Sequence, residues 1–312
     1  MLKKTTRTVS LLIALISSLP LFAGTPLAAT LPAGTPDTLL LEIQGHRGAR
    51  GNFPENTLPA FEFAMQAGVD VLELDLQVTR DLQVVVGHDP VLNREICLNP
   101  DGSRITKEIR VIDLSWSELR QFDCGSLVHP RFPRQKLVPG TRIPSLDEVF
   151  EFVEKKTPSS SGSARPIRFN IELKYDAAHP EWWPKREKFA QLVLKRVRHW
   201  KLQDRVTLQS FDFEMVKVLR RMDAQITLSY LSETAAEDRV ARTLASGAQI
   251  LSPDFDLLTE AEVRSAHARG LRVIPWTLNS AEQWEKAIRL RVDGIITDYP
   301  LDLVKFRATH PR

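Results

Sequence analysis

The chain has 312 residues, with 42 lysine and arginine residues, 39 aspartate and glutamate residues and a formal charge of +3. Its first 29 residues hold three basic residues and no acidic one, so the rest carries 39 of each sign and is neutral. The positive charge therefore gives no support for a nucleic acid or an anionic membrane as a partner, and we expect no nucleic-acid binding.

Residues 1–29 have the layout of a secretory signal peptide. Lys3, Lys4 and Arg7 precede the apolar run Val9–Ala23, and small residues follow up to Ala29. The apolar run has 15 residues, whereas a membrane span needs roughly 20. We predict cleavage near Ala29 and export, to the periplasm in a cell with two membranes or otherwise to the medium. An uncleaved anchor is the alternative, and no stable membrane insertion is expected elsewhere.

The remaining residues suffice for one large domain or two small ones. Cys97 and Cys124 both lie in this part of the chain. In an oxidising compartment they can form a disulfide, which we favour over two buried free thiols.

Short apolar runs of β type alternate along the chain with amphipathic helical runs. Eight runs are predicted as strands, most of them continuously apolar like parallel strands buried on both faces: Leu41–Gln44, Val71–Asp75, Ile167–Leu173, Val206–Gln209, Ile226–Tyr230, Ile250–Ser252, Arg272–Thr277 and Gly294–Thr297. The helical runs between them include Thr57–Ala67, Lys185–Trp200, Phe213–Met222, Glu237–Ser246, Glu260–Ala268 and Ala281–Leu290. This order predicts a TIM (β/α)8 barrel over residues 40–312. A doubly wound sheet would need a Gly-x-Gly-x-x-Gly turn after the first strand, which is absent.

One β-type run breaks this alternation. Leu82–His88 follows the second strand after only Arg80 and Asp81, a gap too short for a parallel crossover. We therefore predict a hairpin over residues 71–89 with a two-residue turn, in which paired residue numbers sum to 161 and His88 stands opposite Glu73.

Residues 90–145 are irregular and are predicted to form an insertion over the catalytic end of the barrel. A helix is expected over Ser145–Lys156. Residues 157–165 are predicted as a flexible linker inside the same domain, because the β/α alternation resumes after them.

Acidic residues stand within two of the apolar strands, near their C-terminal ends, where the function of such a barrel gathers. Glu73 and Asp75 share one face of the second predicted strand, and Glu172 lies on the third. Buried carboxylates need cations, and this oxygen set suits Mg²⁺ or Ca²⁺. The alternative is a structural network neutralised by arginine and lysine.

Basic and aromatic residues stand at the same strand ends. His46 and His88 are candidates for an acid/base pair. Arg47 and Lys174 can bind an anion. Trp276 is either an apolar wall or a core aromatic. A metal, two histidines, an arginine and a lysine around one cavity indicate phosphoryl chemistry.

At these residues the chain resembles the glycerophosphodiester phosphodiesterase family. The matching motifs run in the family's order over nearly the whole chain after residue 40: GHRG at 45–48, PENT at 54–57, ELD at 73–75, VVGHD at 85–89, IELK at 171–174, QSF at 209–211, PWTLN at 275–279 and GIITDYP at 294–300. The resemblance implies a TIM barrel that hydrolyses a small-molecule glycerophosphodiester to an alcohol and sn-glycerol 3-phosphate. Among the family's members it points to the periplasmic or secreted bacterial type.

The resemblance also implies a role for each residue of the site. Glu73, Asp75 and Glu172 would bind the divalent cation, either Ca²⁺ or Mg²⁺, and His46 and His88 would be the acid and base. The other members would contact the substrate: Arg47 and Lys174 the phosphate, Trp276 the glycerol, and Glu55 the metal or the substrate. Which histidine is the acid, and whether water or the glycerol 2-hydroxyl attacks, stay open.

Two rival functions are weighed against this one. Lipid phosphodiesterases, such as those acting on lysophospholipids, share the barrel and the paired histidines, and would have an apolar rim on the insertion. An exported binding protein would have no need for two histidines beside a metal. The oligomeric state is not encoded in any pattern of the sequence.

Overall fold

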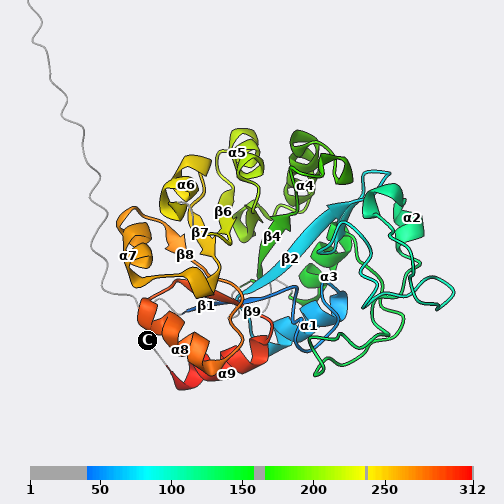
Figure 1. Cartoon of the computed structure of the whole chain (residues 1–312), viewed down its shortest axis with the longest axis horizontal. Helices are drawn as coiled ribbons and strands as arrows, with labels where there is room; N and C mark the ends of the chain where they lie inside the picture. The colour runs from blue at the N-terminus through cyan, green and yellow to red at the C-terminus, as the bar shows by residue number, and fades with distance from the viewer. Residues whose placement is uncertain (1–40, 158–165, 236–237, 311–312) are drawn as a thin grey trace, which may run out of the picture. The chain divides into compact units, whose positions relative to one another are not determined.

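The computed structural model describes residues 41–157, 166–235 and 238–310. The predicted signal peptide with its cleavage point at Ala29, residue 40, and most of the predicted linker lie outside these ranges. Within them, strands and helices alternate around a barrel (Figure 1).

Eight strands in the described ranges form a parallel sheet in the order β8-β7-β6-β5-β4-β2-β1-β9, and a ninth, β3, pairs with β2 outside this order. Their bounds are β1 Glu42–Gly45, β2 Val71–Val78, β4 Arg168–Leu173, β5 Val206–Ser210, β6 Thr227–Ser232, β7 Ile250–Pro253, β8 Arg272–Val273 and β9 Gly294–Thr297. The predicted TIM barrel of eight parallel strands is confirmed, and each predicted run contains one of these strands or overlaps it closely.

The seam between β8 and β9 is joined by scattered backbone bonds in place of a regular ladder. Asp293 N–H donates to the Val273 carbonyl at 2.8 Å, and Ile296 N–H to the Pro275 carbonyl at 3.1 Å. The predicted strand Arg272–Thr277 is shortened to two residues because Pro275 has no N–H for a ladder. The barrel is therefore nearly closed, because these bonds join the segments of the two edge strands.

The helices pack outside the barrel (Figure 1). Their bounds are α1 Leu58–Ala67, α2 Trp116–Leu119, α3 Leu146–Lys156, α4 Arg186–His199, α5 Phe213–Met222, α6 Arg239–Ser246, α7 Glu260–Ala268, α8 Ala281–Leu290 and α9 Pro300–Thr309, with 3₁₀ turns η1 Val111–Asp113, η2 Pro180–Trp182, η3 Gln203–Arg205 and η4 Phe255–Leu257. Thr57 caps the start of α1, and Gly68 and Gly247 end α1 and α6 in the left-handed conformation, as their positions predict. The main hydrophobic core fills the space between strands and helices, with Phe61 and Phe189 fully buried in it.

The hairpin is present, but its predicted register is wrong by one residue. β3 (Val84–Val86) pairs antiparallel with β2, with Leu76 opposite Val86 and Val78 opposite Val84. Three residues form the turn, because Leu82 adopts a left-handed φ of 63° and Thr79 pairs with Gln83. The paired numbers therefore sum to 162, and His88 does not stand opposite Glu73. A one-residue slip of this kind reverses which face a side chain takes.

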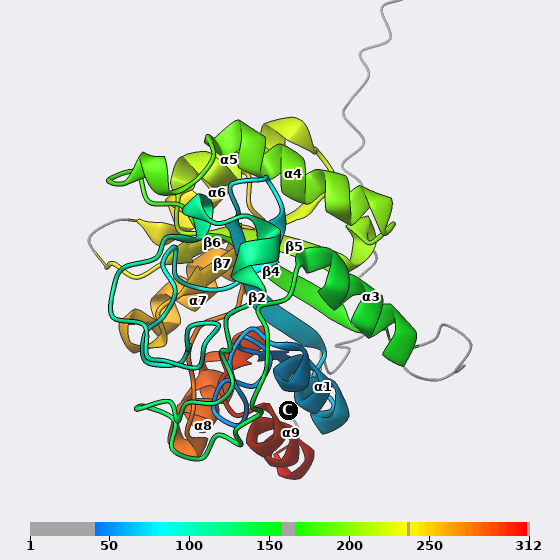
Figure 2. The same ribbon diagram turned by 90° about the vertical axis from the view of Figure 1, so that its right-hand side faces the viewer.

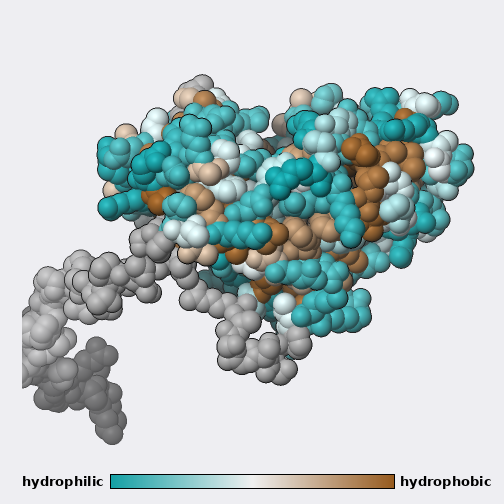
Figure 3. Space-filling model, turned by 90° about the horizontal axis from the view of Figure 1, so that it is seen from below, coloured by the Kyte–Doolittle hydropathy of each residue, from teal (hydrophilic) through white to brown (hydrophobic). Residues whose placement is uncertain are grey.

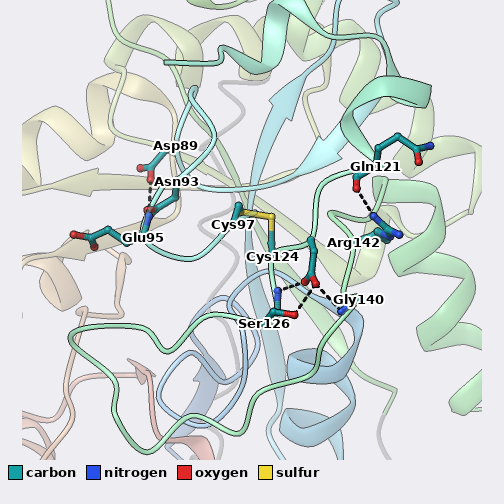
Figure 4. Close-up of a disulfide and its surroundings, with 11 residues drawn as sticks. Asp89, Asn93, Glu95, Cys97, Gln121, Cys124, Ser126, Gly140 and Arg142 are labelled. Atoms are coloured by element: carbon teal, nitrogen blue, oxygen red, sulfur yellow. Dashed lines mark hydrogen bonds between the residues drawn. A yellow bond between two sulfur atoms is a disulfide. The ribbon is translucent and has the colours of Figure 1, made fainter. Parts of the chain in front are cut away.

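The insertion has a small hydrophobic core of its own, to which Leu92, Val111 and Phe122 contribute. Cys97 and Cys124 form the predicted disulfide inside this core (Figure 4). Figure 2, turned toward this side, shows the insertion loops running in front of β2. The predicted helix at its end is α3, which Ser145 caps.

The part of the insertion after the disulfide is attached to the loop that follows β1. Gln135 Nε2 donates to the Arg50 carbonyl at 2.6 Å, and Lys136 N–H to the Asn52 carbonyl at 2.8 Å. The Arg50 guanidinium lies 4.7 Å from the ring centre of Phe132. The insertion therefore covers the loop after β1, at the C-terminal end of the barrel.

The molecular face seen in Figure 3 is mostly hydrophilic, with hydrophobic residues in strips between hydrophilic ones. No helix in the described ranges combines the length and the apolar character that a membrane crossing requires.

Candidate active site

A cavity of about 450 Å³ opens at the C-terminal ends of the strands. It is bounded by charged residues on the side of β1, β2 and β4 and by aromatic and aliphatic ones on the side of β5 to β8. Among the lining residues are His46, Arg47, Arg50, Glu73, His88, Arg131, Glu172, Lys174, Gln209, Phe211, Leu231, Glu233 and Trp276. Of the predicted site residues, Asp75 lies buried beside the cavity and Glu55 behind Arg47; the other seven line it.

The three predicted metal ligands are brought together. Each of Glu73, Asp75 and Glu172 offers a carboxylate oxygen, and these atoms lie within 4.8 Å of one another. All three are buried. Burial and the charge of Asp75 raise the pKa of Glu73 well above its usual value. Burial also raises the pKa of Glu172, whereas Lys174 and Arg47 outweigh burial at Asp75 and lower its pKa.

The two cations beside the acids form ion pairs with them. Lys174 Nζ lies 2.8 Å from Glu172 and 3.2 Å from Asp75. Arg47 Nη1 donates to Glu55 at 2.7 Å, and its Nε lies 3.3 Å from Asp75.

The charge balance of this group fits a divalent cation. When Glu55, Glu73, Asp75 and Glu172 are all ionised, Arg47 and Lys174 balance two of their four negative charges. One divalent cation would balance the other two, and carboxylate oxygens are the donors that Mg²⁺ and Ca²⁺ take. The residues present therefore fit such an ion.

His46 is oriented by a buried carboxylate. Its Nδ1 lies 2.7 Å from Asp298 Oδ1. Arg50 and Asn279 also donate to Asp298, at distances of 2.8 to 3.1 Å. Burial and the nearby Arg50 lower the pKa of His46 to about 4, although Asp298 opposes them. Because Asp298 occupies Nδ1, Nε2 is the nitrogen of His46 left for a substrate.

His88 has a similar partner in a more open setting. Its Nδ1 lies 2.6 Å from Asp89 Oδ1, and both side chains are about one-third exposed. The carbonyl of His88 accepts a hydrogen bond from Gln77 Nε2 at 2.9 Å. Despite the slipped register, His88 lines the same cavity as Glu73 and Glu172. Both histidines thus present Nε2 with Nδ1 held by an aspartate.

Several residues that support the site were missed by the sequence interpretation. Asn56 donates to Asp75 Oδ2 at 2.8 Å and accepts from the Asp75 N–H at 3.3 Å, so it fixes this ligand. Asp298, which follows β9 and holds His46, has no role in the sequence interpretation. Arg131 comes from the insertion and lines the cavity. Asn56 and Asp298 stand inside quoted motifs and could have been found there, whereas no pattern marks Arg131.

The opposite wall of the cavity is apolar. Trp276 packs edge-on against Phe211, with ring centres 5.4 Å apart, and its Nε1 donates to the Ser252 carbonyl at 2.9 Å. Leu231 completes this wall and Glu233 stands beside it. Trp276 is therefore a cavity wall, one of its two predicted roles.

The cavity thus holds two oriented histidines, the cationic side chains of Arg47 and Lys174, and an acid cluster that could bind a metal cation. This combination can neutralise an oxyanion, move a proton onto a leaving oxygen and remove one from a nucleophile.

Comparison with known proteins gives one consistent result. The glycerophosphoryl diester phosphodiesterase family model matches residues 46–302. A glycerophosphodiester phosphodiesterase of Bacillus altitudinis is 31% identical, with the match covering 86% of this chain and 98% of that protein. A lysophospholipase D of Mus musculus is 28% identical, covering 84% of each chain. A crystal structure of a protein from Silicibacter pomeroyi has a TM-score of 0.80 and 31% identity, covering 86% of this chain and 94% of that one.

Proposed function

This chain belongs to the glycerophosphoryl diester phosphodiesterase family and hydrolyses glycerophosphodiesters to an alcohol and sn-glycerol 3-phosphate, and we propose that the reaction takes place in the cavity between His46 and His88. The observation that carries this assignment is the pair of histidines, each with its Nδ1 bound to an aspartate, beside one buried acid cluster.

Glu73, Asp75 and Glu172 would hold one divalent cation, Ca²⁺ or Mg²⁺. When bound, the cation supplies positive charge that withdraws electron density from the phosphodiester oxygens. Arg47 and Lys174 face the same oxygens and bind the phosphate. Glu55 holds the Arg47 guanidinium in place, and Trp276 forms the wall against which the glycerol packs.

The two histidines move the protons. One Nε2 accepts a proton from the attacking hydroxyl, and the other donates a proton to the oxygen of the leaving alcohol. The attacking group is either water or the glycerol 2-hydroxyl, which would give a cyclic phosphate first. Hydrolysis in ¹⁸O-labelled water, sampled early, separates these routes: a transient cyclic product supports attack by the 2-hydroxyl, and its absence supports water.

The activity test uses glycerophosphocholine as substrate and sn-glycerol 3-phosphate as the measured product. We expect release that EDTA abolishes and that Ca²⁺ or Mg²⁺ restores. The substitutions His46→Ala and His88→Ala should each lower kcat by about 10²- to 10⁴-fold. His267→Ala is the matched control, because His267 also pairs with an aspartate, Asp293 at 2.9 Å, but does not line the cavity.

Three outcomes would contradict parts of this proposal. If folded protein releases no sn-glycerol 3-phosphate with any divalent cation, the assigned substrate is wrong. Full activity in EDTA would refute the proposed requirement for a cation. Faster turnover of lysophosphatidylcholine than of glycerophosphocholine would assign the protein to the lysophospholipase D activity named for the mouse relative.

We also propose that the protein is exported, as in the periplasmic or secreted bacterial type of the family. The disulfide Cys97–Cys124 supports this, because such bonds persist in oxidising compartments. Cell fractionation with mass measurement of the mature N-terminus tests it. Recovery of a full-length chain in the reducing cytoplasm would refute export, and a full-length chain in the membrane fraction would indicate the anchor.

A further inference from the structure

A chain of hydrogen-bonded, buried polar side chains runs through the inside of the barrel. We call it the line; its lower end is Glu42, at the start of β1, and its upper end is Glu73 in the acid cluster. Gln44 Nε2 donates to Glu42 Oε1 at 2.7 Å. Asn170 Nδ2 donates to Gln44 Oε1 at 2.8 Å and to Gln209 Oε1 at 3.0 Å. Gln209 Nε2 then donates to Glu73 Oε1 at 3.0 Å. All five residues are at most 7% exposed, and they come from β1, β4, β5 and β2.

The donor and acceptor directions in this line are determined from its Glu42 end. Glu42 accepts from Arg168 and Arg272, so Gln44 must turn its NH₂ group toward Glu42. Gln209 turns its NH₂ group toward Glu73. Both amide carbonyls then point inward at Asn170, whose two N–H groups satisfy them. Rotating any one amide by 180° would place carbonyl against carbonyl or NH₂ against NH₂.

The lower end is a fixed anion. Glu42 Oε2 lies 2.6 Å from Arg168 and 3.0 Å from Arg272, which belong to β4 and β8. The two arginines reach Glu42 from separate strands, so its carboxylate cannot turn without losing one of them.

The line has an energetic cost that a purely structural core would avoid. Asn170 Oδ1 is buried and has no hydrogen-bond partner within the described residues. An unsatisfied buried acceptor costs about 1–3 kcal/mol, whereas apolar side chains of similar shape would avoid that cost. The cost follows directly from pointing both N–H groups of Asn170 at the two glutamine carbonyls.

At its upper end the line reaches the acid cluster. Gln209 holds one oxygen of Glu73, and the backbone N–H of Arg47 holds the other at 2.8 Å. Each Glu73 oxygen keeps a second lone pair for another partner. Partners of this kind orient the ligands of metal sites, and their loss typically lowers metal affinity about 10- to 100-fold.

We propose that Asn170 and Gln209 are positioning residues, which fix the direction of the Glu73 carboxylate for cation binding through a hydrogen-bond line anchored at Glu42. This inference rests on the proposed cation site. Gln209 acts directly on Glu73, and Asn170 acts only through Gln209.

The test is isothermal titration of the full chain with Mg²⁺ and with Ca²⁺, using Gln209→Met, Asn170→Leu and the double variant. Each single change should raise the Kd of the cation about 10- to 100-fold. The double variant should bind no more weakly than Gln209→Met alone, because both act through one hydrogen bond. Raising the cation concentration should restore turnover, which general damage to the core would not allow.

Ser229→Ala is the matched control. Ser229 is also buried, it stands beside Gln209 in the sheet register, and its Oγ has no hydrogen-bond partner within the described residues. Its removal should leave the Kd unchanged. Thermal unfolding of every variant verifies that it is folded.

Several results would overturn the inference. One is an Asn170→Leu variant that binds the cation as tightly as the parent. Others are a double variant whose loss of affinity equals the sum of the two single losses, and a Ser229→Ala variant that loses as much affinity as the test variants. A parent protein that binds neither cation would refute the proposed cation site. Crystal structures of the variants then test separately whether Gln209 and Asn170 orient the Glu73 carboxylate. A Glu73 carboxylate that keeps its parent orientation in Gln209→Met would overturn the inference, and a rotated one would support it.

Discussion

At the scale of single residues, the two histidines have the same kind of partner in different surroundings. Asp298 is buried and accepts from Arg50 and Asn279 as well as contacting His46, whereas Asp89 is partly exposed beside His88. An aspartate offers only acceptor oxygens, so it holds the proton of a neutral imidazole on Nδ1. Because Asp298 is buried and held by two further donors, it determines the tautomer of His46 more firmly than Asp89 determines that of His88.

We expect Asp298→Asn to lower kcat by about 10²- to 10⁴-fold, the contribution of a well-placed acid or base. An asparagine has only one acceptor oxygen, whereas both oxygens of Asp298 accept hydrogen bonds from Arg50 and Asn279. The side chain would therefore reorient, and the proton on His46 Nδ1 would no longer be held in place. Steady-state kinetics measure the effect. Asp89→Asn is the comparison and should lose less, because water can replace an exposed partner. Equal losses in the two variants would contradict the role of burial.

Two glycines near the site predict opposite responses to alanine. Nothing lies within 4 Å of a Cβ built at Gly87, and Gly87 does not have a positive φ. At Gly48 φ is 81°, and a Cβ would come 2.8 Å from the backbone of Ala60. Gly87→Ala should therefore raise the free energy of unfolding by about 0.4–1 kcal/mol by restricting the unfolded chain.

Gly48→Ala should destabilise the protein, because alanine meets both a left-handed backbone and a steric clash there. Urea unfolding of both variants at one pH measures the pair. A loss of stability in Gly87→Ala would show that the space beside Gly87 is not free.

At the scale of elements, patterns within one segment were reliable and pairings between segments were less so. The helical run predicted over Thr57–Ala67 is confirmed as α1, Leu58–Ala67 with Thr57 as its cap, because these limits depend on neighbouring residues only. The hairpin register depends on whether Leu82 belongs to the turn or to the strand. Leucine is uncommon in the left-handed conformation, so a leucine at position 82 does not indicate a three-residue turn.

The disulfide stabilises the insertion as an element. Cys97 and Cys124 lie 27 positions apart in the sequence, and closing a loop of this length contributes about 3.5 kcal/mol in the chain-entropy account. The variant with both cysteines changed to alanine should therefore lose about 2–4 kcal/mol of stability. Denaturant unfolding with and without dithiothreitol measures the loss. Dithiothreitol should lower the stability of the parent and leave that of the variant unchanged. A parent whose stability dithiothreitol does not change would exclude the bond.

At the scale of the whole molecule, the barrel and the position of its site could be predicted because both follow from period and order. Buried strands separated by helices specify parallel pairing, which gathers Glu73, Glu172 and His46 at one end of the barrel. The polar interior could not be predicted. Asn170 and Gln209 meet only because of the stagger between strands, and no spacing along one segment encodes that stagger.

The lower end of the barrel makes stability depend on pH. Burial alone would raise the pKa of Glu42, but Arg272 and Arg168 lower it below its usual value. An acid of this kind stabilises the fold above its unfolded pKa, which is about 4.3, and loses that contribution as pH falls through the folded value. Glu42→Gln should be less stable than the parent at neutral pH, and the difference should narrow below about pH 4.

Urea unfolding across this pH range measures the difference. Glu282→Gln serves as the control, because Glu282 is exposed on α8. A constant gap between the parent and Glu42→Gln at all pH values would show that the arginines do not hold Glu42 ionised.

The attachment of the insertion to the loop after β1 has a consequence over evolutionary time. His46 and the proposed cation ligands stand on barrel strands or directly after them, and His88 follows the hairpin strand β3. The insertion contributes Arg131 to the lining of the cavity. A change in the insertion is therefore felt at Arg50, which contacts Phe132 and Gln135 of the insertion and donates to Asp298 behind His46. We expect the insertion and the loop after β1 to change together over evolutionary time, because one supports the other.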